Sequence, residues 1–131
     1  MNDHEFEQRL QAKGLTAPRV TPADIEANII GECYFTAEQG RAAAARHDGG
    51  HERGWFPACD SANPLDLLTF CVLVLRNGFT VTGESACASP ENFDAEVGRI
   101  AARRNAVNKL WPLMGYELKC RLTASQKVGL S

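Results

Sequence analysis

LTFCVLVLRNGFTVTGESACASPENFDAEVGRIAARRNAVNKLWPLMGY, which covers residues 68–116, is the stretch of sequence that decides the fold. Residues 68–75 are dense in β-branched and apolar side chains, and FTVTG after Asn77-Gly78 alternates apolar with polar residues. Asn-Gly between two such arms is the strongest short hairpin signal, and it predicts a type I′ turn with positive φ at both residues. A helix beginning at Asn63-Pro64 is the rival interpretation, but two β-favouring arms favour the hairpin. Gly83 interrupts the second arm, which indicates a bulge or a close approach of another backbone.

The second half of the stretch predicts one long amphipathic helix. Ser89-Pro90 offers an N-cap and a first helical residue. Pro112 is expected to end or kink this helix, and Gly115 can close it. Apolar residues between these points recur at steps of three and four, so one stripe is predicted to face the sheet. The stripe consists of Phe93, Val97, Ile100, Ala101, Val107, Leu110 and Trp111.

Shorter elements are predicted on both sides. TPAD at residues 21–24 forms a helix start, which predicts a short helix over residues 22–30. Residues 33–38 fit either a strand or a turn. Residues 116–123, YELKCRLT, alternate strictly, which favours a last strand over a helix. The expected fold class is α+β, with a small antiparallel sheet, built on a β-hairpin, packed against one long and one short helix.

These elements form a single α+β domain over residues 21–122, which suits a chain of 131 residues. Residues 1–20 are expected to be flexible or partly helical, and residues 123–131 to be a disordered tail. Residues 40–63 are predicted to be a loop insertion rich in glycine, proline and aspartate, with one helical turn at residues 42–46. Its Trp55-Phe56 pair either pins the loop to the core or forms a lid over a ligand.

Metal-binding residue types are present, but not in a pattern that predicts a site. His47 and His51 could join Cys59 and Asp60 if the histidines shared a helix face, and the two glycines between them argue against that helix. The chain has five cysteines and no C-x-x-C pair, which in a reducing compartment favours free thiols over disulfides or zinc. We therefore expect no metal, no cofactor, and free thiols at Cys33, Cys59, Cys71, Cys87 and Cys120.

The overall composition is that of an ordinary soluble protein. Acidic residues outnumber basic ones by 16 to 14, so the molecule as a whole has no attraction for phosphate backbones and nucleic acid is not the expected partner. The longest apolar run, residues 67–75, is far shorter than the roughly 20 residues that span a bilayer. The polar N-terminus contains no secretory signal. We therefore expect a cytosolic protein with no membrane contact.

Three features are candidates for ligand binding, each with a structural alternative. The predicted start of the long helix has free N–H groups for an anion, with Ser89 and Asn92 as partners and Thr82 and Ser85 nearby, although ordinary capping would use the same groups. Guanidinium groups on one flank of the helix suit phosphate, although surface ion pairs explain the same spacing. Aromatic rings could stack on a base, although core packing explains some of them. The flank comprises Glu96, Arg99, Arg103, Arg104 and Lys109, and the rings are Tyr34, Trp55, Phe56 and Trp111.

Catalysis is not predicted. Residues 68–116 contain no histidine, and Ser85 and Cys87 have no evident base partner in the sequence. Glu84 and Glu91 could act as paired carboxylates only if the fold brought them together. We therefore expect a non-enzymatic protein.

The chain resembles a family of small tailed-phage and prophage proteins named after one protein each of the podophages N-four and Sf-six. The resemblance covers roughly residues 20–122 and is most specific in NGFTVTGESACASPENFD and in the closing WPLMGY. It implies a small α+β phage accessory protein of the host cytoplasm and carries no catalytic residues. Phage proteins of similar size include oligomeric sponges that sequester nucleotide immune signals, which is an analogy of size and setting.

Two functional hypotheses follow. In the first, the protein is a homo-oligomer that binds a small anionic nucleotide as a counter-defence. In the second, it binds a host or phage protein, or DNA through the arginine flank, to modulate host takeover. The ligand-binding residues expected under the first are Thr82, Ser85, Ser89, Asn92, Arg99, Arg103 and Trp111.

Overall fold

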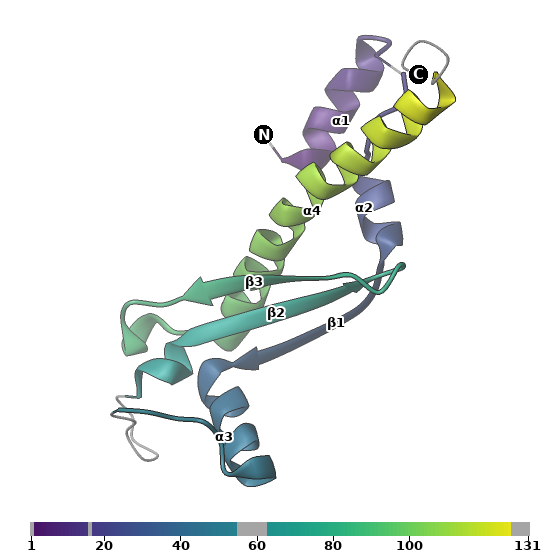
Figure 1. Cartoon of the computed structure of the whole chain (residues 1–131). Coiled ribbons are helices and arrows are strands. Elements are labelled where there is room, and N and C mark those ends of the chain that lie inside the picture. The colour runs from purple at the N-terminus through teal and green to yellow at the C-terminus, as the bar shows by residue number, and fades with distance from the viewer. Residues whose placement is uncertain (1, 16, 55–62, 127–131) are drawn as a thin grey trace.

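The computed structural model of the chain describes residues 2–15, 17–54 and 63–126. It confirms the predicted α+β fold: three antiparallel strands in the order β1-β2-β3 form a sheet, and one long helix crosses one of its faces (Figure 1). In chain order the elements are α1 (Asp3–Ala12), α2 (Pro22–Asn28), β1 (Ile29–Thr36), α3 (Ala37–Asp48), the 3-10 helix η1 (Pro64–Leu67), β2 (Leu68–Leu75), β3 (Thr80–Ala86), the 3-10 helix η2 (Pro90–Asn92) and α4 (Ala95–Ser125).

The predicted hairpin is present, but its turn differs from the predicted one. The N–H of Gly78 donates to the carbonyl of Leu75 at 2.9 Å, and the N–H of Leu75 donates to the carbonyl of Phe79 at 2.9 Å. Gly78 has a φ of 87°, whereas Asn77 keeps a negative φ. The loop is therefore a type I turn followed by a left-handed glycine, because Arg76 joins it as a third residue. The side chain of Asn77 accepts the N–H of Phe79 at 2.9 Å and supports this shape.

Strand β3 and helix α4 approach each other so closely that only small residues fit between them. An ideal Cβ on Gly83 would lie 2.1 Å from the carbonyl oxygen of Ala102 and 2.3 Å from the nitrogen of Ala106. Both alanines are fully buried. Of the two predictions made for Gly83, the close backbone approach is the one that the structure confirms.

The face that α4 turns to the sheet matches the predicted stripe only in part. Of the predicted residues, Leu110 is fully buried and Val107 and Trp111 pack against the core, whereas Val97 and Ile100 are 61% and 53% exposed. The other buried residues of α4 are Ala102 and Ala106, which with Leu110 follow steps of four residues. The contact with β3 selects these alanines because they let the two backbones meet, and it leaves Val97 and Ile100 toward solvent.

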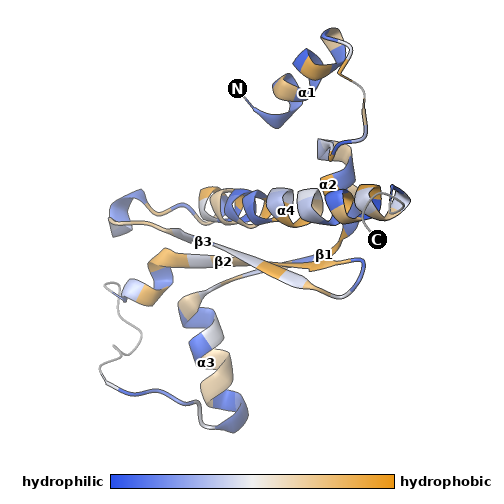
Figure 2. Ribbon diagram, turned by 45° about the horizontal axis from the view of Figure 1, so that its top comes forward, coloured by the Kyte–Doolittle hydropathy of each residue, from blue (hydrophilic) through white to orange (hydrophobic). Residues whose placement is uncertain are grey.

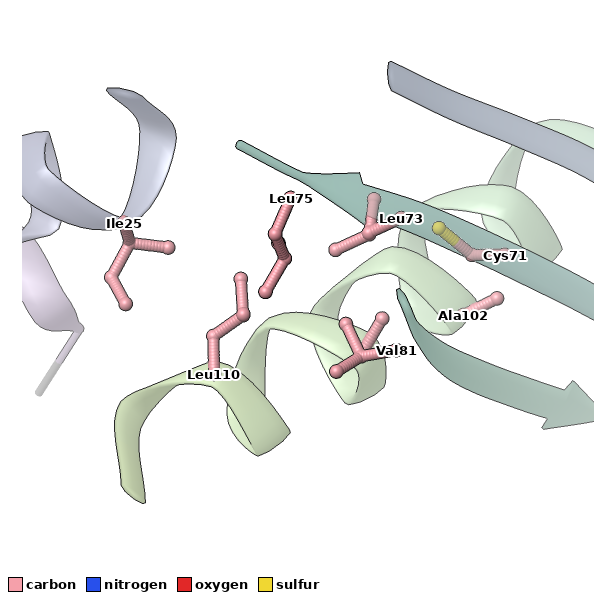
Figure 3. Close-up of a cluster of buried hydrophobic side chains, with 8 residues drawn as sticks. Ile25, Cys71, Leu73, Leu75, Val81, Ala102 and Leu110 are labelled. Carbon is pink, nitrogen blue, oxygen red and sulfur yellow. The ribbon is translucent and has the colours of Figure 1, made fainter. Parts of the chain in front are cut away.

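The core is a single cluster between sheet and helix (Figure 3). Strand β2 alternates strictly, so Cys71, Leu73 and Leu75 all point to the α4 side and are buried. Val81 of β3 joins them. Ile25 of α2 closes the end of the cluster near Leu75 and Leu110 (Figure 3).

Helix α2 begins as predicted, and the ambiguous residues after it form a strand. Thr21 and Asp24 make a reciprocal capping box, with bonds of 3.1 and 2.9 Å. The helix ends at Asn28, two residues earlier than predicted, because β1 begins at Ile29 and pairs antiparallel with β2. Residues 33–36 therefore belong to β1, and residues 37–38 begin the next helix.

The start of the predicted loop insertion is helical. Helix α3 has its own capping box, between Thr36 and Gln39, and ends at Gly49, which has a φ of 81°. The predicted single turn at residues 42–46 is therefore only part of a 12-residue helix. Gly40 lies inside this helix because an ideal Cβ there would already be 3.4 Å from the Phe35 ring. Figure 2 shows α3 and α4 on opposite sides of the sheet.

Both ends of the described chain are more helical than expected. Residues 3–12 form α1, capped by the side chain of Asn2, which agrees with the partly helical alternative. Helix α4 continues through Pro112 to Ser125, so the strand predicted at residues 116–123 is wrong. A strand needs a neighbour for its backbone groups, whereas a continued helix satisfies them internally. Residues 127–131 of the predicted tail, and Trp55-Phe56, lie outside the described residues.

Replacing Gly83 with alanine is expected to destabilise the protein by about 3 kcal/mol, because the new methyl group would overlap the α4 backbone. Gly115→Ala, in helix α4, is the control, since a Cβ there meets nothing within 4 Å. That variant should be neutral or slightly stabilising. Urea unfolding of both variants measures the difference, and equal midpoints would contradict the close contact.

Replacing Gly78 with valine is expected to cost about 1–3 kcal/mol, because a β-branched residue is strained at positive φ. Asn77→Val tests the corrected turn, since Asn77 has negative φ and loses only its bond to Phe79. Thermal unfolding should therefore show the smaller loss for Asn77→Val. A larger loss at Asn77 would restore the type I′ prediction.

Candidate functional site

The seven residues predicted to bind a ligand do not meet at one place. Thr82 is exposed on the sheet face opposite α4, because its neighbours Val81 and Gly83 point toward that helix. Ser85 and Asn92 line a cavity of about 190 Å³ that also contains the carboxylate of Asp94. The sequence pattern could not separate these positions, because it does not show which way each side chain points.

The predicted anion site at Ser89 and Asn92 is not at the start of α4. Ser89 makes no side-chain capping bond and precedes the short 3-10 helix η2. Helix α4 begins at Ala95, and the side chain of Asp94 accepts the N–H of Val97 at 3.0 Å. A carboxylate thus occupies the positive end of the helix dipole. An anionic ligand would meet like charge there.

Arg103 ties three elements together. Its Nη1 and Nη2 donate to the two carboxylate oxygens of Glu26 in α2 at 3.1 and 2.9 Å, and its Nε donates to Glu32 in β1 at 2.9 Å. The hydrogen bonds that Arg103 donates to Glu26 and then to Glu32 raise the pKa of Arg103. The bond that Glu26 accepts from Arg103 lowers the pKa of Glu26. Two carboxylates neutralise this arginine, so it is not available as the main anion-binding group.

Arg99 instead lines a cleft beside the end of the sheet. We call it the Arg99 cleft; its volume is about 300 Å³. Arg99 is exposed at its rim and makes no ion pair with any described residue. Rings of half-buried aromatic residues form much of the wall. The lining residues are Tyr34, Phe35, Thr36, Gln39, Asp66, Thr69, Phe93, Ala95 and Arg99.

Thr69 gives the Arg99 cleft a buried polar group without a partner. The residue is 3% exposed, and its Oγ1 makes no hydrogen bond within the described part of the chain. The α4 backbone covers it, since an ideal Cβ on Gly98 would lie 2.9 Å from Oγ1. An unsatisfied buried hydroxyl costs about 1–3 kcal/mol, and because the helix covers it, this cost belongs to the fold itself.

The charges of the Arg99 cleft are balanced and local. Arg99 and Asp66 are the charged residues of its lining, one of each sign. The burial of Tyr34 raises the pKa of its phenol, which keeps the hydroxyl protonated at neutral pH. The cleft therefore offers the guanidinium of Arg99 at its rim, aromatic rings along its wall and the neutral hydroxyl of Tyr34.

Trp111 lies apart from this cleft. It lines a cavity of about 200 Å³ between α4 and α1, with Phe6 and Leu10 from α1. The ring is partly buried against the core cluster. Packing therefore accounts for Trp111, as the structural alternative predicted.

Another cavity, of about 640 Å³, was not predicted from the sequence. Residues 18–20, helix α2, the hairpin turn and the second half of α4 all contribute to it. Four separate segments meet there, so no local pattern could have revealed it. The basic residues Arg19, Arg76 and Arg121 were the available signal, but their spacing in the sequence is irregular.

Metal-ligand residue types do not gather in the described part of the chain, which holds no cluster of three or more. His51 lies 3.4 Å from Asp48 in an exposed pair. Cys33, Cys71, Cys87 and Cys120 are free thiols. Cys59 and Asp60 lie outside the described residues. No helix within the described ranges is long and apolar enough to cross a membrane.

The fold and the Arg99 cleft define a small α+β protein with a ligand-sized pocket and no recognisable catalytic group in its lining. The chain belongs to the phage protein (N4 Gp49/phage Sf6 gene 66) family, whose model matches residues 20–122. This confirms the resemblance seen in the sequence. Neither a curated protein nor a solved structure shows significant similarity to the chain.

Replacing Arg103 with alanine is expected to destabilise the protein at neutral pH and to weaken the acid dependence of its stability. The pKa of Glu26 is below its ordinary 4.5 when folded, so its contribution is present above that pH and is lost as the pH falls through the folded value. Urea unfolding from about pH 7 to about pH 3 measures both effects. Arg104→Ala, at an exposed position on the same helix, should leave the slope unchanged. An unchanged slope for Arg103→Ala would contradict the role of this ion pair.

Proposed function

We propose that this phage protein is a non-enzymatic accessory protein of the host cytoplasm that binds a small nucleotide signal in the Arg99 cleft and sequesters it as a counter-defence. One observation carries the proposal: the cleft has an aromatic wall, and its rim has an arginine free of ion pairs with the described residues.

The geometry favours a ligand with a flat ring and an anionic group. The ring packs against Tyr34 or Phe93, since aromatic faces stack well on bases. The phosphate contacts Arg99, whose planar guanidinium suits phosphate oxygens. A cleft of about 300 Å³ is at the small end for ligand sites, which favours partial enclosure of the ligand.

The lining residues support binding rather than catalysis. None of the residues of the Arg99 cleft is a histidine, a cysteine or a lysine, which are the usual bases and nucleophiles. Asp66 is its one carboxylate. A protein that holds a signal without altering it acts by lowering the free concentration of the signal, and this requires a high copy number or tight binding.

The test is calorimetric titration of the purified protein with cyclic ADP-ribose isomers and cyclic di- and trinucleotides. Binding should be lost in Arg99→Ala and retained in Arg104→Ala, which removes an exposed arginine of α4 outside the cleft. Thr69→Val should leave binding nearly unchanged and unliganded stability unchanged or raised, because the covered hydroxyl contacts no ligand and has no partner to lose.

No binding tighter than about millimolar across the panel would reject the proposal. A specific observation then favours the second hypothesis, contact with a host or phage protein. Val97 and Ile100 are more than half exposed on the outer face of α4 next to Arg104, a mixed apolar and basic surface of the kind found in protein interfaces. Light scattering during the same titrations would show whether the protein is a homo-oligomer.

A further inference from the structure

We propose that the cavity of about 640 Å³ is a second binding site, for a compact anion with phosphate-type oxygens. It lies at the other end of the sheet from the Arg99 cleft, because β2 runs from η1 beside that cleft to the hairpin turn that lines this cavity. We call it the Arg76 cavity. Its lining residues are Pro18, Arg19, Val20, Asp24, Ala27, Asn28, Arg76, Asn77, Met114, Glu117, Leu118 and Arg121.

Arg76 is held in place by its backbone and by one of its own nitrogens. Its N–H donates to the carbonyl of Asn28 at 3.0 Å, and its Nε donates to the carbonyl of Ala27 at 2.6 Å. Its two terminal nitrogens have no acceptor among the described residues. A guanidinium group fixed at Nε with its outer donors unused is prepared to receive two oxygens of one anion.

Two further arginines reach the cavity from other segments. Arg19 pairs with Glu7 through one terminal nitrogen, while its buried Nε has no partner in the described structure. Arg121 pairs with Glu117 at 3.2 Å, and both side chains are more than 60% exposed. Such an exposed pair is worth little and can be exchanged for a ligand contact.

The local charge is close to balanced. Three arginines face two carboxylates in the lining, a balance of +1, and Glu7 outside the lining offsets Arg19, which brings the sum to zero. Of the two carboxylates, Asp24 already accepts the N–H of Thr21, and Glu117 is paired with Arg121. The attraction is therefore short-ranged and comes from aligned donors around Arg76.

The shape of the lining limits the ligand class. It contains no aromatic residue that could stack on a base. The amide of Asn28 is already engaged, since it accepts the N–H of Arg76 at 3.2 Å and its Nδ2 donates to the sulfur of Met114 at 3.5 Å. These features favour a phosphate-type group over a nucleoside, which distinguishes this site from the Arg99 cleft.

Titration of the full chain with inorganic phosphate, followed by nuclear magnetic resonance of backbone amides, tests the proposal. Saturable shifts should be centred on residues 18–28 and 76–78, and an equal ionic strength of chloride should not produce them. Arg121→Gln should weaken phosphate binding severalfold, and Arg76→Gln about tenfold. Arg104→Gln is the control and should bind as the wild type does.

Because Arg76 also bonds Ala27, the amide spectrum of Arg76→Gln first has to show an intact fold. If it does not, Arg121→Gln decides alone, since among the described residues the exposed side chain of Arg121 pairs only with Glu117. No saturation in the wild type, or equal affinity in wild type and Arg121→Gln, overturns the proposal. The outcome is independent of the nucleotide hypothesis, because the two cavities share no lining residue.

Discussion

The contact between Gly83 and the Ala102–Ala106 segment of α4 is the constraint on which the other features of the fold depend. It presses helix and strand together backbone to backbone, so the rotation of α4 about its axis is fixed at this point. Side chains on either side of the contact then reach opposite edges of the sheet. Arg103 reaches β1 and α2, while the amide of Asn105 donates to the carbonyl of Glu84 in β3 at 2.7 Å. The long helix is thus held by packing in the centre and by polar contacts at both flanks.

The arginines of the chain divide into those that hold elements together and those that remain available. Arg103 connects α4 to two carboxylates, and Arg41 pairs with Glu38 of its own helix α3 and connects that helix to Glu52. Glu38 also accepts the amide of the buried Asn63 at 2.9 Å, so α3 is tied to the chain on both sides of residues 55–62. Hydrogen bonds from Arg41 and then Asn63 lower the pKa of Glu38. Neither arginine that connects elements lines the Arg99 cleft or the Arg76 cavity.

Local signals in the sequence predicted local structure well. The β2–β3 hairpin and the cap at Thr21 each depend on a few neighbouring residues. The close approach at Gly83 was indicated by a glycine within a strand, although its partners in α4 are distant in the sequence. Periodicity predicted the burial of Leu110 but not of Ala102 and Ala106, because the first half of α4 carries Val97 and Ile100 on its outer face and alanines on its inner one. Only one turn of α3 was predicted, because a glycine-rich stretch lies beside its Thr36–Gln39 capping box. The end of α4 was misread because YELKCRLT fits a period of two when its helical neighbour is ignored.

The candidate sites show the same limit more strongly. Arg99 was predicted from charge alone, but Thr69 and Phe93 join it from other segments, and no spacing relates them. The described residues contain two buried side-chain polar atoms without a partner, Arg19 Nε and Thr69 Oγ1, and each belongs to a residue that lines a cavity. Such atoms lower the stability of a small fold by about 1–3 kcal/mol each. Both atoms are covered by the surrounding protein, so their cost belongs to folding alone. A ligand in either cavity would therefore add stability by mass action through the accessible groups of the lining and not through these two atoms.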